Sequence, residues 1–268
     1  MIRAAVLGSP INHSLSPILH SVAYKHLGIM GEYLAIEVQP DALAKFIATC
    51  DISWTGFSLT MPLKEEVIVV ADEVDPLAMQ IESANTLLRH EKGWRAITTD
   101  VNGFRMALNF HKVTTWHSAV VIGSGATARA AMAALDGTGR VITVIHRNPK
   151  RCPAMLKAAP LSAVNFLDWA APLPQTDITI NTTPAGAADS LAQSLASRVD
   201  GVLFEALYNP WPTLLLEKWR ESGGQVIDGL DLLVHQGIDQ IALMTGLEIE
   251  REEFAPLLRK AGLAALRR

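Results

Sequence analysis

Short apolar runs alternate with segments of helical period along most of the chain. In the first half, the apolar runs predict strands at residues 4–7, 32–36 and 56–59. The segments between them predict helices at residues 17–27, 41–48 and 64–71. This alternation is typical of βαβ units, so we expect a mostly parallel sheet.

A second βαβ pattern begins in the middle of the chain. Its apolar runs predict strands at residues 119–122, 141–145, 177–180, 201–204 and 225–227. A helix at 230–245 is predicted to end at Gly246, and a helix at 100–110 to bridge the two halves. Because the halves share no repeat, we expect two different α/β domains. The first is completed by the C-terminal helices, and a Rossmann-type domain is inserted into it.

Composition and charge narrow the functional classes. The 268 residues are 49% hydrophobic and 19% charged, with a formal net charge of −4, which is typical of a compact globular protein. A nucleic-acid partner is disfavoured because the basic residues are scattered. The first residues lack the pattern of a signal peptide, and no apolar run approaches the roughly 20 residues needed to span a bilayer. We therefore expect a cytoplasmic protein.

The cysteines and histidines give no indication of a metal or thiol site. Cys50 and Cys152 are the only cysteines and form no CxxC spacing, so we interpret both as structural. The eight histidines likewise lack metal-ligand spacing. The sequence therefore predicts no catalytic metal.

A glycine turn follows the strand predicted at 119–122. Gly123, Gly125 and Ala128 fit the pattern G-x-G-x-x-[G/A], placed after a strand and at the start of a helix. Gly123 would allow the tight turn, Gly125 the close approach of a pyrophosphate, and Ala128 the packing of helix on strand. The helix N-terminus would then face the phosphates. The alternative is a strand-to-helix turn without a ligand.

The end of the next strand distinguishes between two dinucleotides. An NAD site calls for Asp or Glu there, whereas a 2′-phosphate calls for Arg. The segment at 146–151, His-Arg-Asn-Pro-Lys-Arg, holds three cations and no carboxylate, which favours NADP. Arg147 could grip the phosphate and stack on adenine. Lys150 and Arg151, taken singly, are equally well explained as solvated surface residues.

Polar residues also gather at turns that follow strands in the first half, within residues 8–17, 56–64, 82–86 and 98–103. Open α/β sheets bind ligands at such positions. Taken alone, each has a simpler explanation. Ser14 and Ser16 could cap a helix, Lys64 could be solvated, and Asn85 and Asp100 could stabilise turns.

Together, however, these segments resemble the successive motifs of the shikimate dehydrogenase family. The matching segments are Ser14-Leu15-Ser16, Thr60-Met61-Pro62-Leu63-Lys64, Ala84-Asn85-Thr86, Thr99-Asp100 and Gly229-Leu230-Asp231-Leu232-Leu233-Val234-His235-Gln236-Gly237. The glycine turn and residues 181–186 and 208–213 are similar to further motifs of that family. The resemblance extends from Gly8 to about Gly246.

The resemblance implies a two-domain NADP(H)-dependent oxidoreductase that interconverts 3-dehydroshikimate and shikimate without a metal. It implies a substrate-binding domain of residues 1–101 plus 236–268 and an NADP-binding domain of residues 102–235. The implied catalytic pair is Lys64 and Asp100. The implied substrate residues are Ser14, Ser16 and Tyr208 for the carboxylate, and Thr60, Asn85 and Gln236 for ring hydroxyls. The implied cofactor residues are Gly123, Gly125, Ala126, Arg147, Thr183 and Gly229.

Some positions depart from the family pattern. Ser58 and Thr98 stand where Asn is usual, Ala126 replaces a glycine, and Glu205 replaces an Asp. Arg147 is flanked by His and Asn rather than by the common Asn and Thr. None of these changes removes a proposed catalytic group.

Two other functions remain open. One is a quinate dehydrogenase, although quinate-preferring relatives tend to carry a bulkier hydroxyl residue than the serines at 14 and 16, a difference of about 1–3 kcal/mol. The other is a non-catalytic NADP-binding sensor. Intact Lys64 and Asp100 argue against the sensor. A buried charged pair is costly to desolvate, and a protein that catalyses no reaction has no physical need to keep one. We expect only small-molecule partners, a monomer or homodimer, and a hinge that closes on the substrate.

Overall fold

The structure is a computed structural model that describes residues 1–91 and 93–267. The chain divides into two compact units. The first unit is Met1–Gly103 together with Leu233–Arg268, and the second unit is Phe104–Leu232. Both boundaries fall inside helices, α5 (Asp100–Phe110) and α10 (Gly229–Thr245). Each unit has its own sheet, so the predicted class of two α/β folds is confirmed.

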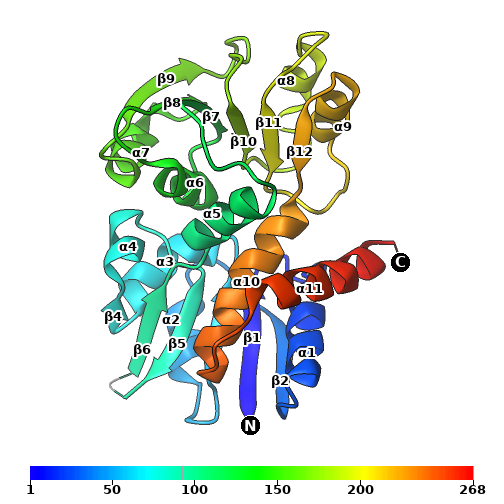
Figure 1. The fold of residues 1–268 in the computed structure, drawn as a ribbon. Coiled ribbons are helices and arrows are strands. Elements are labelled where there is room, and N and C mark those ends of the chain that lie inside the picture. Colours follow the sequence, from blue (N-terminus) through cyan, green and yellow to red (C-terminus); the bar gives the residue numbers. More distant parts are fainter. Residues whose placement is uncertain (92, 268) are drawn as a thin grey trace. The chain divides into compact units, whose positions relative to one another are not determined.

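The first unit contains a six-stranded sheet in the order β2-β1-β3-β5-β6-β4 (Figure 1). Its strands are β1 (Ile2–Gly8), β2 (Gly31–Glu37), β3 (Gly56–Leu59), β4 (Glu73–Val74), β5 (Thr86–His90) and β6 (Gly93–Ile97). β1 is parallel to β2 and β3, β6 is parallel to β4, and β5 runs antiparallel to both its neighbours. β4, β5 and β6 were not predicted from the sequence.

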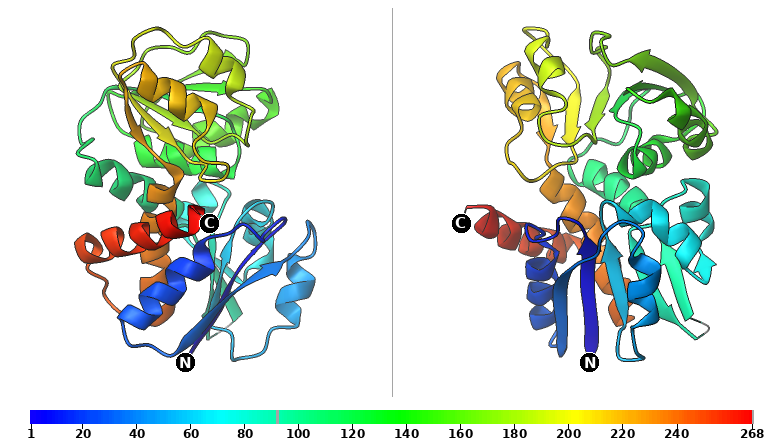
Figure 2. Two further views of the ribbon diagram at one scale, coloured as in Figure 1. Left: turned by 90° about the vertical axis from the view of Figure 1, so that its right-hand side faces the viewer. Right: turned by 180° about the vertical axis from the view of Figure 1, so that it is seen from behind.

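Helices cover this sheet on two sides. The helices are α1 (Ser16–His26), α2 (Leu43–Ala48), α3 (Leu63–Val70), α4 (Pro76–Gln80), α11 (Arg251–Leu266) and the later turns of α10. α11 packs alongside α1, as the left view of Figure 2 shows.

The two faces of this sheet differ in chemistry. Phe57 and Leu59 of β3 belong to an apolar core that also contains Leu43 of α2 and Leu63 of α3. Successive side chains of a strand point to opposite faces, so Ser58, between these two residues, points away from that core. The second face of the sheet therefore receives a buried hydroxyl group.

The second unit contains a parallel six-stranded sheet in the order β12-β11-β10-β7-β8-β9. Its strands are β7 (Ser118–Ile122), β8 (Val141–His146), β9 (Ala163–Asp168), β10 (Ile178–Asn181), β11 (Val202–Glu205) and β12 (Gln225–Ile227). Strand order reverses between β7 and β10. Such switch points are where doubly wound sheets bind ligands at the carboxyl ends of their strands. β9 was not predicted.

Helices also cover both faces of the second sheet. They are α6 (Ala126–Leu135), α7 (Cys152–Ala158), α8 (Asp189–Gln193) and α9 (Leu214–Glu221). Val120 and Ile122 of β7 share an apolar core with residues of α8 and α9. Within residues 1–91 and 93–267, no helix has the length and apolar character needed to cross a membrane.

Candidate active site

The sheet of the first unit brings several predicted site residues to one edge. β1 and β3 are parallel neighbours, so the loop after β1, with Ser14, lies beside the loop after β3, with Thr60 and Lys64. β5 runs the opposite way, so Asn85 precedes it at this same edge, and β6 ends there just before Asp100. These residues lie next to four strand ends, and the order and direction of the strands bring those ends to the same edge of the sheet.

Lys64 and Asp100 form a close, largely buried ion pair. Lys64 Nζ lies 2.6 Å from Asp100 Oδ2, and the two side chains are only 15% and 6% exposed. Lys64 stands in the first turn of α3, and its carbonyl accepts a hydrogen bond from the backbone N–H of Ala84 at 2.9 Å. A lysine held in this way is not a solvated surface residue. Keeping such a pair out of water is costly, which is more typical of function than of stability.

The Asn85 amide links this ion pair to α10. Asn85 Nδ2 lies 2.9 Å from Asp100 Oδ1 and 3.0 Å from Gln236 Oε1. Asn85 Oδ1 accepts from the backbone N–H of Thr99 at 2.7 Å, which fixes the orientation of the amide. Two amides and an ammonium thus lie together as hydrogen-bonding groups for an oxygen-rich molecule.

Ser14, Ser16 and Thr60 lie at this edge of the sheet as well. Ser16 begins α1 and is buried, and its backbone N–H donates to Ser14 Oγ at 3.3 Å. Thr60 packs against Gly8, where a Cβ would come within 2.4 Å of Thr60 Cγ2. Gly8 therefore allows the loops after β1 and β3 to approach closely.

The glycine turn of the second unit is shaped by its backbone. Gly123 has φ +111°, and a Cβ there would lie 2.6 Å from Thr182 Oγ1. Gly125 is the N-cap of α6 and provides no side-chain cap, so the free N–H groups of the first turn, beginning at Ala126, remain available to an anion. Arg151 Nη1 donates to the Ser124 carbonyl at 3.2 Å, which ties the segment after β8 to this turn.

Arg147 is exposed at the end of β8, and its guanidinium carbon lies 5.1 Å from the centroid of the Trp169 ring. Trp169 was not among the site residues predicted from the sequence. β9 pairs with β8 so that Asp168 lies opposite His146, which brings the residue after each strand side by side. Recognising β9 would have predicted this contact.

Thr183 and Gly229 lie beyond the carboxyl ends of β10 and β12. Thr183 Oγ1 donates to Asn181 Oδ1 at 2.8 Å, and Asn181 in turn donates to the buried Glu205 carboxylate at 2.9 Å. Burial raises the pKa of Glu205, although hydrogen bonds from Asn181, Thr213 and the Leu207 backbone partly oppose the shift. At Gly229, a Cβ would lie 2.5 Å from the backbone of Leu207, the neighbour of Tyr208.

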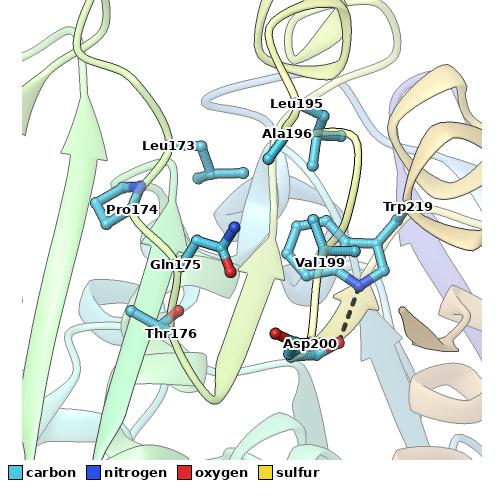
Figure 3. Close-up of a pocket in the computed structure, with 10 residues that line it drawn as sticks. Leu173, Pro174, Gln175, Thr176, Leu195, Ala196, Val199, Asp200 and Trp219 are labelled. Carbon is cyan, nitrogen blue, oxygen red and sulfur yellow. Dashed lines mark hydrogen bonds between the residues drawn. The ribbon is translucent and has the colours of Figure 1, made fainter. Parts of the chain in front are cut away.

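A separate hollow of about 310 Å³, part of it open to solvent, lies in the second unit (Figure 3). It is lined mainly by uncharged residues such as Leu173 and Val199, and the Trp219 indole N–H donates to the Gly201 carbonyl beside it at 3.1 Å. Thr176 and Gly201 precede β10 and β11, so the hollow is at the amino ends of these strands. It contains none of the predicted site residues.

Among residues 1–91 and 93–267, no three His, Cys, Asp or Glu side chains gather as a metal site would require. The groups present at the carboxyl ends of the two sheets include the Lys64 ammonium, the Asp100 carboxylate, the Asn85 and Gln236 amides and the exposed Arg147 guanidinium.

Comparisons with known proteins match this arrangement. A family model described as the shikimate dehydrogenase substrate binding domain matches residues 6–87. The NADP(+) shikimate dehydrogenase of Archaeoglobus fulgidus is 34% identical over 283 residues, covering 100% of both chains.

Solved structures agree. The shikimate dehydrogenase of Mycobacterium tuberculosis is 36% identical with a TM-score of 0.86, covering 96% of this chain and 99% of that one. The shikimate 5-dehydrogenase of Thermus thermophilus in complex with NADP(H) and shikimate is 30% identical with a TM-score of 0.83, covering 97% and 100%. This chain belongs to the shikimate dehydrogenase family.

Proposed function

We propose that this chain catalyses the reversible NADPH-dependent reduction of 3-dehydroshikimate to shikimate, a step in the biosynthesis of aromatic amino acids. The observation that carries the proposal is the buried pair of Lys64 and Asp100, 2.6 Å apart, with the amides of Asn85 and Gln236 beside it. The names of the relatives support the same reaction, as does a solved relative that holds NADP(H) and shikimate.

In this proposal, Lys64 transfers the proton and Asp100 orients Lys64. As the ketone is reduced, its oxygen gains negative charge and then a proton, and Lys64 Nζ both stabilises that charge and donates the proton. Asp100 holds the ammonium through its contact at Oδ2 and keeps it oriented. In the reverse direction, Lys64 takes the proton back from the hydroxyl group.

The remaining polar residues at this edge position the substrate. Asn85, Gln236 and Thr60 hold ring hydroxyls, and Ser14 and Ser16 bind the carboxylate. The family resemblance adds Tyr208 to the carboxylate-binding set. Neutral hydroxyl and amide donors suit a carboxylate that must also leave the enzyme after each turnover.

The second unit has features that fit NADP. Gly123 and Gly125 leave room for a pyrophosphate at the N-terminus of α6, where Ala126 begins the helix. Arg147 offers an exposed guanidinium for the 2′-phosphate, while Thr183 and Gly229 are assigned to the nicotinamide end. Bound NADPH supplies the hydride, which leaves binding, orientation and proton transfer to the protein.

The direct test is a set of initial-rate assays. We expect NADPH oxidation with 3-dehydroshikimate and NADP reduction with shikimate, both much faster than with quinate or with NAD(H). Lys64→Ala and Asp100→Asn should each lower kcat by about 10²–10⁴-fold, which is the usual range for losing a general acid or its partner. Lys45→Ala, which removes an exposed lysine of α2, is the matched control and should leave kcat unchanged.

Two outcomes would contradict the proposal. If the wild type binds shikimate and NADPH but turns over neither substrate, the chain is a sensor rather than an enzyme. If quinate is the preferred acid, the assignment of shikimate as substrate is wrong while the catalytic pair stands.

A further inference from the structure

A layer of buried polar side chains lies on the face of the first sheet away from its apolar core. Its members come from four elements: α1, β2, β3 and α10. Tyr33 is 6% exposed, Ser58 4%, Gln240 1% and His20 1%. Burying this many polar groups is costly unless each one is hydrogen-bonded, so each of them needs a partner.

The layer makes one continuous chain of hydrogen bonds that ends at the proposed catalytic pair. Tyr33 OH donates to Ser58 Oγ at 2.5 Å, and Ser58 Oγ donates to Gln240 Oε1 at 2.7 Å. Gln240 Nε2 donates to Thr86 Oγ1 at 2.9 Å, and Thr86 Oγ1 donates to Asn85 Oδ1 at 3.2 Å.

The last link joins this chain to the ion pair, because Asn85 Nδ2 donates to Asp100 Oδ1 at 2.9 Å. Each group therefore donates toward Asp100, which is the anion at the end of the chain.

Backbone groups fix this direction. Gln240 Nε2 lies 3.0 Å from the Asn85 backbone carbonyl, which can only accept, so Gln240 must turn its NH₂ group toward Asn85 and its Oε1 toward Ser58. His20 also hydrogen-bonds to Gln240, and burial lowers the pKa of His20 to about 3, so its ring stays neutral. At the other end, the Thr99 N–H donates to Asn85 Oδ1 and fixes that amide.

Gln236 and Gln240 are one helical turn apart on α10 and contact Asn85 from the same face of the helix. Gln236 bonds to the side-chain amide of Asn85, whereas Gln240 bonds to its backbone carbonyl and, through Thr86, to its side-chain oxygen. Gln236 is assigned to the substrate. Gln240 faces the sheet and is 1% exposed, so its partners are protein groups.

We propose that Gln240 is a positioning residue for the reaction, which holds Asn85 so that its NH₂ group stays on Asp100. The proposal rests on the proposed function of Lys64 and Asp100. Without the two bonds from Gln240 Nε2, the Asn85 carbonyl loses a buried donor and the Thr86 hydroxyl is free to rotate away from Asn85 Oδ1. Asn85 then shifts, and Asp100 loses a hydrogen bond that orients it toward Lys64.

The test is a double-mutant cycle on kcat. Gln240→Met, close in shape but unable to donate, should lower kcat about 10–100-fold while the KM for NADPH stays within twofold of the wild type. If Gln240 acts only through Asn85, adding Gln240→Met to Asn85→Ala should cause no further loss of kcat. A purely structural role would instead give additive losses, and equal kcat for Gln240→Met and the wild type would overturn the proposal.

Further variants keep the test decisive if Gln240→Met does not fold. Thr86→Val removes only the relay hydroxyl and should lower kcat in the same direction, and no change in kcat would overturn the proposal. Ser58→Ala removes a bond on the far side of Gln240, where His20 still donates, and should have a much smaller effect. Thr245→Val, which deletes a hydroxyl elsewhere on α10, is the control and should leave kcat unchanged. An inactive wild type would refute the proposed function itself.

Discussion

The cluster around Lys64 and the glycine turn around Gly123 are built on different principles. In the first, buried side chains hold one another, from Asp100 through Asn85 to Gln240. In the second, backbone shape creates the space, and the charged residue expected to recognise the cofactor, Arg147, is exposed. In the first region buried polar groups bond to one another, whereas in the second region the glycines leave room for a ligand because they carry no side chain.

The contrast predicts which changes each region tolerates. Removing one partner from a buried hydrogen-bonded cluster leaves the other unsatisfied, at a cost of about 1–3 kcal/mol. At the glycine turn, adding a single Cβ is the damaging change, while removing an exposed charge should affect mainly the ligand. The predictions that follow test this contrast, beginning with the largest expected effect.

Gly123→Ala should strongly weaken NADPH binding, because the proposed cofactor site depends on the backbone shape of the glycine turn. At φ +111°, an alanine is strained, and its Cβ would approach within 2.6 Å of Thr182 Oγ1, which is itself anchored to the Ile122 carbonyl. Strain of this kind costs about 1–3 kcal/mol before the clash is added. We expect NADPH to bind about 100-fold more weakly, as measured by fluorescence titration.

Gly139→Ala separates strain from contact. Gly139 also has a positive φ, +77°, but no atom lies within 4 Å of a Cβ there. This control should lose a little stability and keep its affinity for NADPH. If both variants bind NADPH as tightly as the wild type, the glycine turn is not the cofactor site.

The polar layer of the first unit should make stability depend on pH through His20. Burial lowers the pKa of His20 from 6.5 to about 3. Between these values the unfolded chain binds the proton more readily than the folded one, so stability is fully present above pH 6.5 and falls as the pH is lowered toward 3. Between pH 6.5 and 5 the expected loss is about 2 kcal/mol.

Urea unfolding of the wild type and of His20→Gln at several pH values measures this effect. Glutamine can still donate to Gln240 and accept from Tyr24 but does not titrate, so the difference between the two curves isolates His20. The difference should grow as the pH falls from 6.5 to 5. Parallel curves would mean that folding leaves the pKa of His20 unchanged.

Arg147→Gln should weaken NADPH binding about tenfold and leave NADH binding unchanged. The residue is exposed, so its interaction with a phosphate is partly screened by water and salt, and the effect should shrink at high ionic strength. Lys150→Gln is the neighbouring control, since Lys150 is equally exposed. If Arg147→Gln weakens the binding of NADPH and NADH equally, or if Lys150→Gln weakens NADPH binding more, Arg147 does not recognise the 2′-phosphate.

Local sequence patterns predicted much of the fold because several strands contain short apolar runs. The last four residues of β7, Ala-Val-Val-Ile, are all apolar and all buried, and such a run is distinctive. The strands that were missed are short or half exposed. β4 has two residues, and β9 alternates between exposed and half-buried positions as the outermost strand of its sheet. Their position depends on pairing with a neighbour, which no local pattern records.

The site divides in the same way. Turn residues such as Lys64 and Asp100 stand out because they follow strands, and the structure brings these two into contact. The layer behind them did not stand out, because a glutamine or histidine on a helix usually indicates a solvated face. One signal was present: Gln236 and Gln240 are four residues apart on the predicted helix at 230–245, which places both on one face.

Trp169→Leu tests the smallest effect, and its sign is informative. An exposed cation–π contact contributes about 0.5–1 kcal/mol, and here it holds the Arg147 guanidinium over the ring before any ligand arrives. If this contact preorganises Arg147 for the 2′-phosphate, its loss should weaken NADPH binding about twofold. Leucine keeps the apolar packing of position 169 against the core of the second unit.

If the indole instead competes with the ligand for the guanidinium, Trp169→Leu should bind NADPH more tightly. The double variant tests whether the effect depends on the contact between Trp169 and Arg147. In the Arg147→Gln variant this contact is already absent, so adding Trp169→Leu should not change NADPH binding further. A side-chain contact that influences binding here would show that the second region also relies, in one place, on the principle that governs the first.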